Sequence, residues 1–216
     1  MKPSIIVINP NSNCYVTAGL SKALNPYRLV GGPKIECLTN SNGPFGIESE
    51  LDSESVIPDI IDEITKRKDA GAFVIACYSD PGLEVCRSIF DAPIYGIAEA
   101  GILMALGQGN KFGVVAIAEP SIERHIKSIR RMGVIDRLSS ERALNITVDE
   151  TARGLKTFEM LVKVGNELLE DGADVIILGC AGMATHRSKL EKELGKPVVD
   201  PTQAAVSMAL GNILIS

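Results

Sequence analysis

The sequence contains no tryptophan, and aromatic residues make up only 4% of its 216 residues. Ile, Val, Leu and Ala must therefore fill the core, and an apolar share of 45% is ample for that. No stretch of about 18 apolar residues occurs, so we expect no membrane span. Runs of about five or more Lys or Arg are also absent, and the formal net charge is −5. Nucleic-acid binding, which needs a positively charged surface, is therefore not expected.

Histidine and cysteine patterns argue against a metal site and against a disulfide framework. The two histidines, His125 and His186, do not stand at metal-ligand spacing from any cysteine. The cysteines are odd in number, and no Cys-x-x-Cys motif occurs. The short apolar run at 5–8 is typical of a buried strand, and a signal peptide would need a longer one. We therefore expect reduced thiols, no bound metal, and a cytoplasmic protein.

Short apolar runs that end at turn signals alternate with longer helical patterns along the chain. The runs predict strands over 4–8, 35–38, 72–76, 94–97, 112–117, 145–148, 175–178 and 198–199. The helical patterns cover 56–67, 99–106, 121–132, 151–170 and 202–213, with Ser121 as the N-cap of the third. Strands that alternate with helices of this length predict an α/β fold with parallel sheets.

The pattern occurs twice, which indicates an internal repeat of about 100 residues. Cys77 and Cys180 each follow a buried strand, each strand is preceded by an Asp/Gly/Ala turn, and Pro93 and Pro197 introduce the next strand in each copy. We expect two pseudo-symmetric, Rossmann-like halves, each a mainly parallel sheet flanked by helices. The active-site cleft should lie between the carboxyl ends of their strands. Residues 1–96 with 201–216 would form the first half, the last helix packing back on it, and 97–200 the second.

Two thiols that face each other across such a cleft can act as an acid–base pair. One thiolate removes a proton from a carbon next to a carbonyl, and the other thiol returns a proton to the opposite face. The ordinary thiol pKa of about 8.5 lies within reach of neutral pH. Backbone N–H groups in the loops at 9–11, 77–80 and 180–182 would stabilise the thiolates and the enolate. Cys14, Cys37 and Cys86 are expected only to pack against neighbouring residues.

Five motifs give the chain a resemblance to the hydantoin and allantoin racemases of the aspartate/glutamate racemase superfamily. They are Asn-Pro-Asn-Ser at 9–12, Gly-Pro-Phe-Gly-Ile-Glu-Ser at 43–49, Cys-Tyr-Ser-Asp-Pro-Gly-Leu at 77–83, Gly-Ile-Ala-Glu-Ala at 96–100 and Leu-Gly-Cys-Ala-Gly-Met at 178–183. The resemblance implies a cofactor-independent epimerisation at C5 of a hydantoin or allantoin ring, a small-molecule substrate, and a homo-oligomer.

The same resemblance assigns roles to individual residues. Cys77 and Cys180 would be the acid–base thiols. The substrate would be lined by Asn11, Ile47, Tyr78, Ser79, Asp80, Ala181 and Gly182, although Asp80 could instead bond its own loop. Relatives often carry threonines after the first strand of the second half, where this chain has the stretch around Ile117.

Other functions remain open from the sequence. A second two-cysteine enzyme of the same superfamily, an amino-acid racemase or a maleate-type cis–trans isomerase, would use the same thiols, the isomerase with one of them attacking carbon. A non-catalytic small-molecule-binding protein would need no thiol chemistry. A redox-sensing thiol protein would join Cys77 and Cys180 reversibly in a disulfide.

Overall fold

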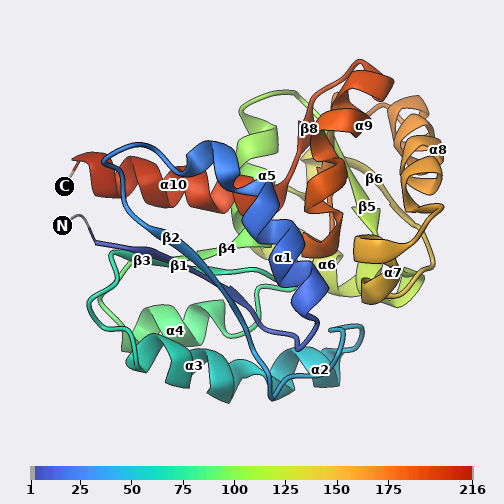
Figure 1. Cartoon of the computed structure of the whole chain (residues 1–216). Helices are drawn as coiled ribbons and strands as arrows, with labels where there is room; N and C mark the ends of the chain where they lie inside the picture. Colours follow the sequence, from blue (N-terminus) through green and yellow to red (C-terminus); the bar gives the residue numbers. More distant parts are fainter. Residues whose placement is uncertain (1–2, 216) are drawn as a thin grey trace.

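Two four-stranded sheets, parallel throughout, form the centre of the computed structural model, which describes residues 3–215 (Figure 1). The strand orders are β2-β1-β3-β4 and β6-β5-β7-β8. The strands are β1 (Ile5–Asn9), β2 (Ile35–Thr39), β3 (Ala72–Ile75), β4 (Ile94–Gly96), β5 (Phe112–Ala116), β6 (Leu138–Ala143), β7 (Val175–Leu178) and β8 (Val198–Val199). Because the second order repeats the first, the prediction of an α/β fold with two similar halves is confirmed.

Helices flank both sheets (Figure 1). The α-helices are α1 (Cys14–Ala23), α2 (Glu50–Ser55), α3 (Ile57–Thr65), α4 (Leu83–Ile89), α5 (Ile97–Leu106), α6 (Glu119–Arg131), α7 (Val148–Arg153), α8 (Thr157–Glu170), α9 (Arg187–Leu194) and α10 (Pro201–Ile215). Three short 3₁₀ helices complete the described residues: η1 (Asn25–Tyr27), η2 (Ile135–Arg137) and η3 (Ala181–His186). None of the helices described is both long and apolar enough to cross a membrane.

The inner strands of the first sheet, β1 and β3, are buried on both faces, which is why they appear in the sequence as apolar runs. Along β1, Ile5 and Val7 belong to the main core, whereas Ile6 and Ile8 belong to a smaller one. This alternation follows from the two-residue period of a strand. The smaller core lies under α3 and α4, on the face of the sheet opposite α10 (Figure 1).

The helix that follows the last strand of each sheet packs on the other sheet. Helix α5 follows β4 of the first sheet but packs against β5, β7 and β8 of the second. Helix α10 follows β8 of the second sheet and packs against β1, β3 and β4 of the first. The two helices also pack against each other. The division into residues 1–96 with 201–216 and residues 97–200 stays a prediction.

Three predicted elements of the second half are wrong, and each has a local reason. Residues 145–148 do not form a strand: β6 ends at Ala143, Asn145 adopts a left-handed conformation with φ 55°, and α7 begins at Val148. The helix predicted over 151–170 is divided into α7 and α8. Helix α7 ends at Arg153, and the Gly154 N–H donates to the Glu150 carbonyl as its C-cap. Ser121 is not an N-cap, because α6 begins two residues earlier.

Candidate active site

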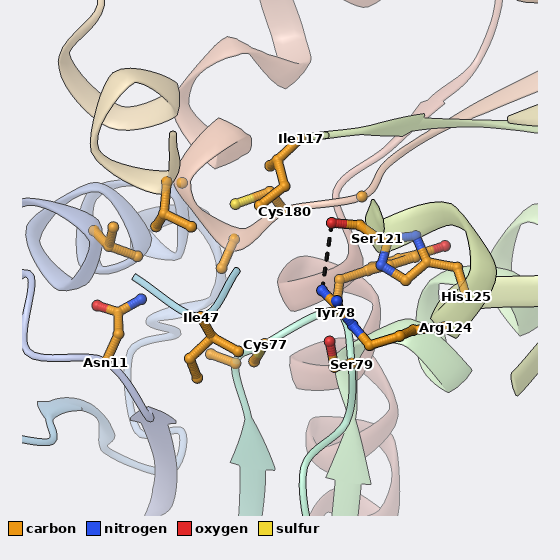
Figure 2. Close-up of a pocket in the computed structure, with 16 residues that line it drawn as sticks. Asn11, Ile47, Cys77, Tyr78, Ser79, Ile117, Ser121, Arg124, His125 and Cys180 are labelled. Carbon is orange, nitrogen blue, oxygen red and sulfur yellow. Dashed lines mark hydrogen bonds between the residues drawn. The ribbon is translucent and has the colours of Figure 1, made fainter. Parts of the chain in front are cut away.

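Cys77 and Cys180 occupy equivalent positions in the two sheets. Each lies two residues beyond the end of an inner strand, β3 or β7. In each case the residue just after the strand still donates to the neighbouring strand: Ala76 N–H to Ile8 O at 2.8 Å, and Gly179 N–H to Val115 O at 2.9 Å. The chain then leaves the sheet, and both cysteines line one cavity (Figure 2).

This cavity lies between the two halves and encloses about 400 Å³, including the part that is open to solvent. Eight of the nine predicted site residues line it: Asn11, Ile47, Cys77, Tyr78, Ser79, Cys180, Ala181 and Gly182. The residues come from loops that are far apart in the sequence but meet at the carboxyl ends of the strands. That is where ligands of open α/β sheets bind.

Asp80, the ninth predicted residue, does not appear in this lining. Its carboxylate accepts the N–H of Ala98 and the N–H of Glu99, each at 2.9 Å, at the start of α5. Gly96 lies against the same carboxylate, so closely that a Cβ there would be 2.3 Å from the carboxyl carbon. Burial raises the pKa of Asp80 to about 7, although these two N–H groups oppose the shift. The structure thus places Asp80 at a helix start, between Cys77 and α5.

Both thiols are strongly desolvated. Burial raises the pKa of Cys77 to about 12, with the Ser79 N–H acting in the opposite direction. Burial also raises the pKa of Cys180, and there the opposing donor is the Gly182 N–H. In each loop, therefore, the amide two residues after the cysteine lowers the pKa of the thiol. Burial outweighs these N–H groups, so both thiol pKa values lie above the ordinary value and not near neutral pH as the sequence led us to expect.

Asn11 presents its amide NH₂ to the cavity. Its Oδ1 accepts the backbone N–H of Asn13 at 3.0 Å and the side-chain amide of Asn9 at 2.9 Å. Because a backbone N–H can only donate, these bonds fix which side-chain atom is the oxygen. The nitrogen is therefore the atom that faces the cavity, as Figure 2 shows. A carbonyl oxygen of a bound molecule would find a donor here.

Helix α6 contributes Ser121, Arg124 and His125, three lining residues that the sequence prediction missed (Figure 2). The His125 Nδ1 forms a very short contact with the Glu141 carboxylate, and both side chains are almost fully buried. The Tyr78 ring meets His125 edge-on, with ring centroids 4.8 Å apart. Burial raises the pKa of Glu141, and its bond to His125 opposes that shift. The i, i+3, i+4 spacing of the three residues would have revealed a shared face, had the start of α6 been predicted correctly.

An apolar wall completes the cavity. Val16, Ile47, Ile117 and Val148 all line it, together with Ala76. Ile117 is the residue that stands where the family resemblance leads one to expect a hydroxyl side chain. An apolar group on a bound molecule would therefore find an apolar surface opposite the polar side chains of α6.

The short helix α7 connects the cavity to the first half. Glu48 precedes α2, and its carboxylate accepts the N–H of Val148 at 2.9 Å. Asn13 donates to the Asp149 carboxylate, also at 2.9 Å. Thr151 lies one turn further along, with its Oγ1 3.7 Å from the Cys180 sulfur. Residues of the first half thus hold the helix that contacts the second cysteine.

Within the described residues 3–215, no group of three or more His, Cys, Asp or Glu side chains is arranged as a metal site. The polar groups of the cavity are instead thiols, amides, hydroxyls, one imidazole and one guanidinium. Paired thiols at equivalent strand ends, on two similar sheets that share a cavity, are an arrangement suited to proton transfer at both faces of one carbon.

Comparison with known proteins identifies the family. A model described as Asp/Glu/Hydantoin racemase matches residues 5–209, so the chain belongs to the Asp/Glu/hydantoin racemase family. It is 36% identical over 214 residues to the hydantoin racemase of Paenarthrobacter aurescens, covering 95% of this chain and 89% of that protein. The identity is 37% over 217 residues to the hydantoin racemase of Pseudomonas sp. strain NS671, with coverages of 95% and 84%.

The fold matches a solved structure of the same kind. The allantoin racemase from Klebsiella pneumoniae superposes with a TM-score of 0.91 at 27% identity, covering 99% of this chain and 88% of the other. The family expected from the sequence motifs is therefore confirmed.

Proposed function

We propose that this protein racemises a carbon acid next to a carbonyl, at C5 of a 5-substituted hydantoin or of allantoin, with Cys77 and Cys180 as its two bases. The observation that carries the proposal is the equivalent placement of the two cysteines on one shared cavity. A racemase must reach both faces of the same carbon, and two thiols from two facing halves provide that access.

The proposed reaction needs two proton transfers. The thiolate of one cysteine takes the C5 proton, and the electron pair of the C–H bond moves into the adjacent carbonyl to form an enolate. The thiol of the other cysteine then gives its proton to the opposite face of C5, and the electron pair returns from oxygen. Each turnover exchanges the protonation states of Cys77 and Cys180. The Asn11 amide NH₂ would donate to the developing enolate oxygen.

The shape of the cavity supports a substrate with one polar and one apolar side. The ring carbonyl and N–H groups would face Asn11, Ser79 and Ser121, and the C5 substituent would face Ile47 and Ile117. Among hydantoins, an apolar substituent matches this wall better than the ureido group of allantoin, which would leave buried polar atoms without partners.

The test is racemisation in D₂O of enantiopure 5-substituted hydantoins and of allantoin. We expect loss of optical rotation together with uptake of one deuterium at C5, above the spontaneous rate measured without protein. C77S and C180S should each abolish the enzymatic rate. The matched control is C14S, because Cys14 is an exposed thiol away from the cavity. No exchange on a broad panel of hydantoins, or full activity in either cavity variant, would refute the proposal.

Two further expectations accompany this function. Thiol acid–base chemistry requires free cysteines, which fits the predicted cytoplasmic location. A homo-oligomer is expected as well, and light scattering on the full chain would measure it.

A further inference from the structure

Thr151 holds a buried hydroxyl between a carbonyl and the second cysteine. Its side chain is fully buried in α7. Its Oγ1 lies 2.6 Å from the Val148 carbonyl oxygen and 3.7 Å from the Cys180 sulfur. Gly182 stands against it so tightly that a Cβ at that position would be 2.1 Å from Oγ1. The hydroxyl is therefore confined to this place.

The two contacts of this hydroxyl differ in direction. A threonine hydroxyl has one proton to donate and two lone pairs. The carbonyl of Val148 can only accept, and 2.6 Å is a short O–H···O distance, so the proton points to Val148. A lone pair of Oγ1 is then what faces Cys180. The partner that suits a lone pair is a thiol S–H, and a thiolate would meet repulsion there.

Cys77 has a different neighbour. The Ser79 N–H and hydroxyl lower the pKa of the Cys77 thiol, against the larger effect of burial. One backbone N–H acts in the same direction on each cysteine. The difference that the geometry shows lies at Cys180, where the proton of the neighbouring hydroxyl is already taken by the Val148 carbonyl.

We propose that Thr151 is a positioning residue that accepts a hydrogen bond from the Cys180 thiol, so that Cys180 is the proton donor and Cys77 the thiolate when the free protein meets its substrate. The inference rests on the proposed two-thiol function and adds the starting protonation state. Glu48 contributes from the first half, because its bond to the Val148 N–H fixes the residue whose carbonyl takes the Thr151 proton.

Other ionisable groups face the same sulfur. They are Cys77 across the cavity, Glu48 in the loop before α2, and Asp200 at the start of α10. Arg124 and His125 line the cavity from α6. A substitution at Thr151 leaves all of these in place, so a change in the titration of Cys180 would report on the hydroxyl.

The experiment is alkylation of the full-length protein with iodoacetamide from pH 6 to pH 12, a range that reaches the raised pKa of the Cys77 thiol, with each cysteine followed by peptide mass spectrometry. The midpoint of each pH profile measures thiolate formation and is independent of how fast the reagent reaches the sulfur. In the parent protein we expect Cys77 to react with a lower midpoint than Cys180. T151V should lower the Cys180 midpoint and raise its reactivity at a fixed pH by up to about tenfold, the effect of losing one hydrogen bond.

Two variants serve as controls. T151S keeps the hydroxyl and should restore the parent profile. T157V removes another buried hydroxyl, which donates to the Glu150 carbonyl at 2.6 Å without contacting Cys180, and should leave the Cys180 midpoint unchanged. An unchanged or higher Cys180 midpoint in T151V would overturn the inference. So would a parent protein in which Cys180 has the lower midpoint, and that comparison needs no variant to fold.

Because alkylation needs no substrate, the two proposals fail separately. A protein that racemises hydantoins but shows the reverse order of midpoints contradicts only the role of Thr151. A protein with the expected order that racemises nothing contradicts the proposed function.

Discussion

Replacing Asp80 by asparagine separates a structural role from a substrate-binding role. The two carboxylate oxygens of Asp80 each accept one N–H at the start of α5. An asparagine has only one oxygen, so its NH₂ would face the second N–H. One buried amide then loses its acceptor, which costs about 1–3 kcal/mol. The helix start also loses a negative charge, but burial raises the pKa of Asp80 to about 7, so the cost of burying that charge offsets its benefit to the helix.

The expected loss, about 1–3 kcal/mol, corresponds to a fall in Tm of roughly 5 °C for a chain of this size. Urea unfolding at pH 8.5 measures it, because this pH lies above the pKa of about 7 that burial gives Asp80. We expect a lower midpoint with an unchanged slope. At low temperature, where D80N is folded, KM for the proposed substrate should equal that of the parent. A fully stable D80N with a raised KM would refute this reasoning and place the carboxylate on the substrate.

Two further predictions concern other carboxylates. Burial raises the pKa of Asp200 to about 6, and one of its oxygens has no partner. Its contribution to stability is therefore present below about pH 4 and lost as the pH rises towards 6. The unfolding free energy of the parent, minus that of D200N, should fall over this range, and a flat difference would contradict the prediction. E48A removes the acceptor of the Val148 N–H and should cost about 1–3 kcal/mol. It should also speed amide hydrogen exchange in α7, while E48Q, which keeps an acceptor, should exchange at nearly the parent rate. Equal exchange in E48A and the parent would show that the bond does not hold α7.

The positions of the two cysteines could be predicted because buried parallel strands leave a strong local signal. Continuous apolar runs such as 72–76 and 175–178 can hardly be surface elements, and the residue after each run must lie at the carboxyl edge of a sheet. The repeat then placed Cys77 and Cys180 at equivalent positions. Most of the cavity-lining residues of the first half lie in the same sequence motifs and could be predicted from them.

The parts of the cavity lining that come from α6 and α7 could not be predicted from the strand pattern, because they depend on where these helices begin. Pro120 suits the first turn of a helix, and taking Ser121 as the cap moved the start too far along the chain. A capping box at Thr147 and Glu150 marks the start of α7 and was available in the sequence. It was missed because the residues around Ile146 are β-branched and suggested a strand.

Asp80 illustrates a different limit. The sequence left it to the substrate or to its own loop, and the helix that follows, α4, begins at Leu83 with Gly82, at φ 69°, as its N-cap. The helix that Asp80 does cap is α5, which starts 17 residues later. Only the tertiary arrangement brings that helix start to the carboxylate.

The packing of α5 and α10, each on the sheet that it does not directly follow, has a consequence for the stability of the protein. The chain before residues 107–111 carries the helix that covers the second sheet, and the chain after them carries the helix that covers the first. This is the arrangement of a domain-swapped dimer, here joined into one chain. A protease cut in that loop would leave two pieces, each carrying the helix that covers the other's sheet. Neither piece could bury its own apolar face alone, so the two should remain associated and unfold together. The separation between the two sulfurs is thereby fixed by the same interlocking that keeps the chain folded.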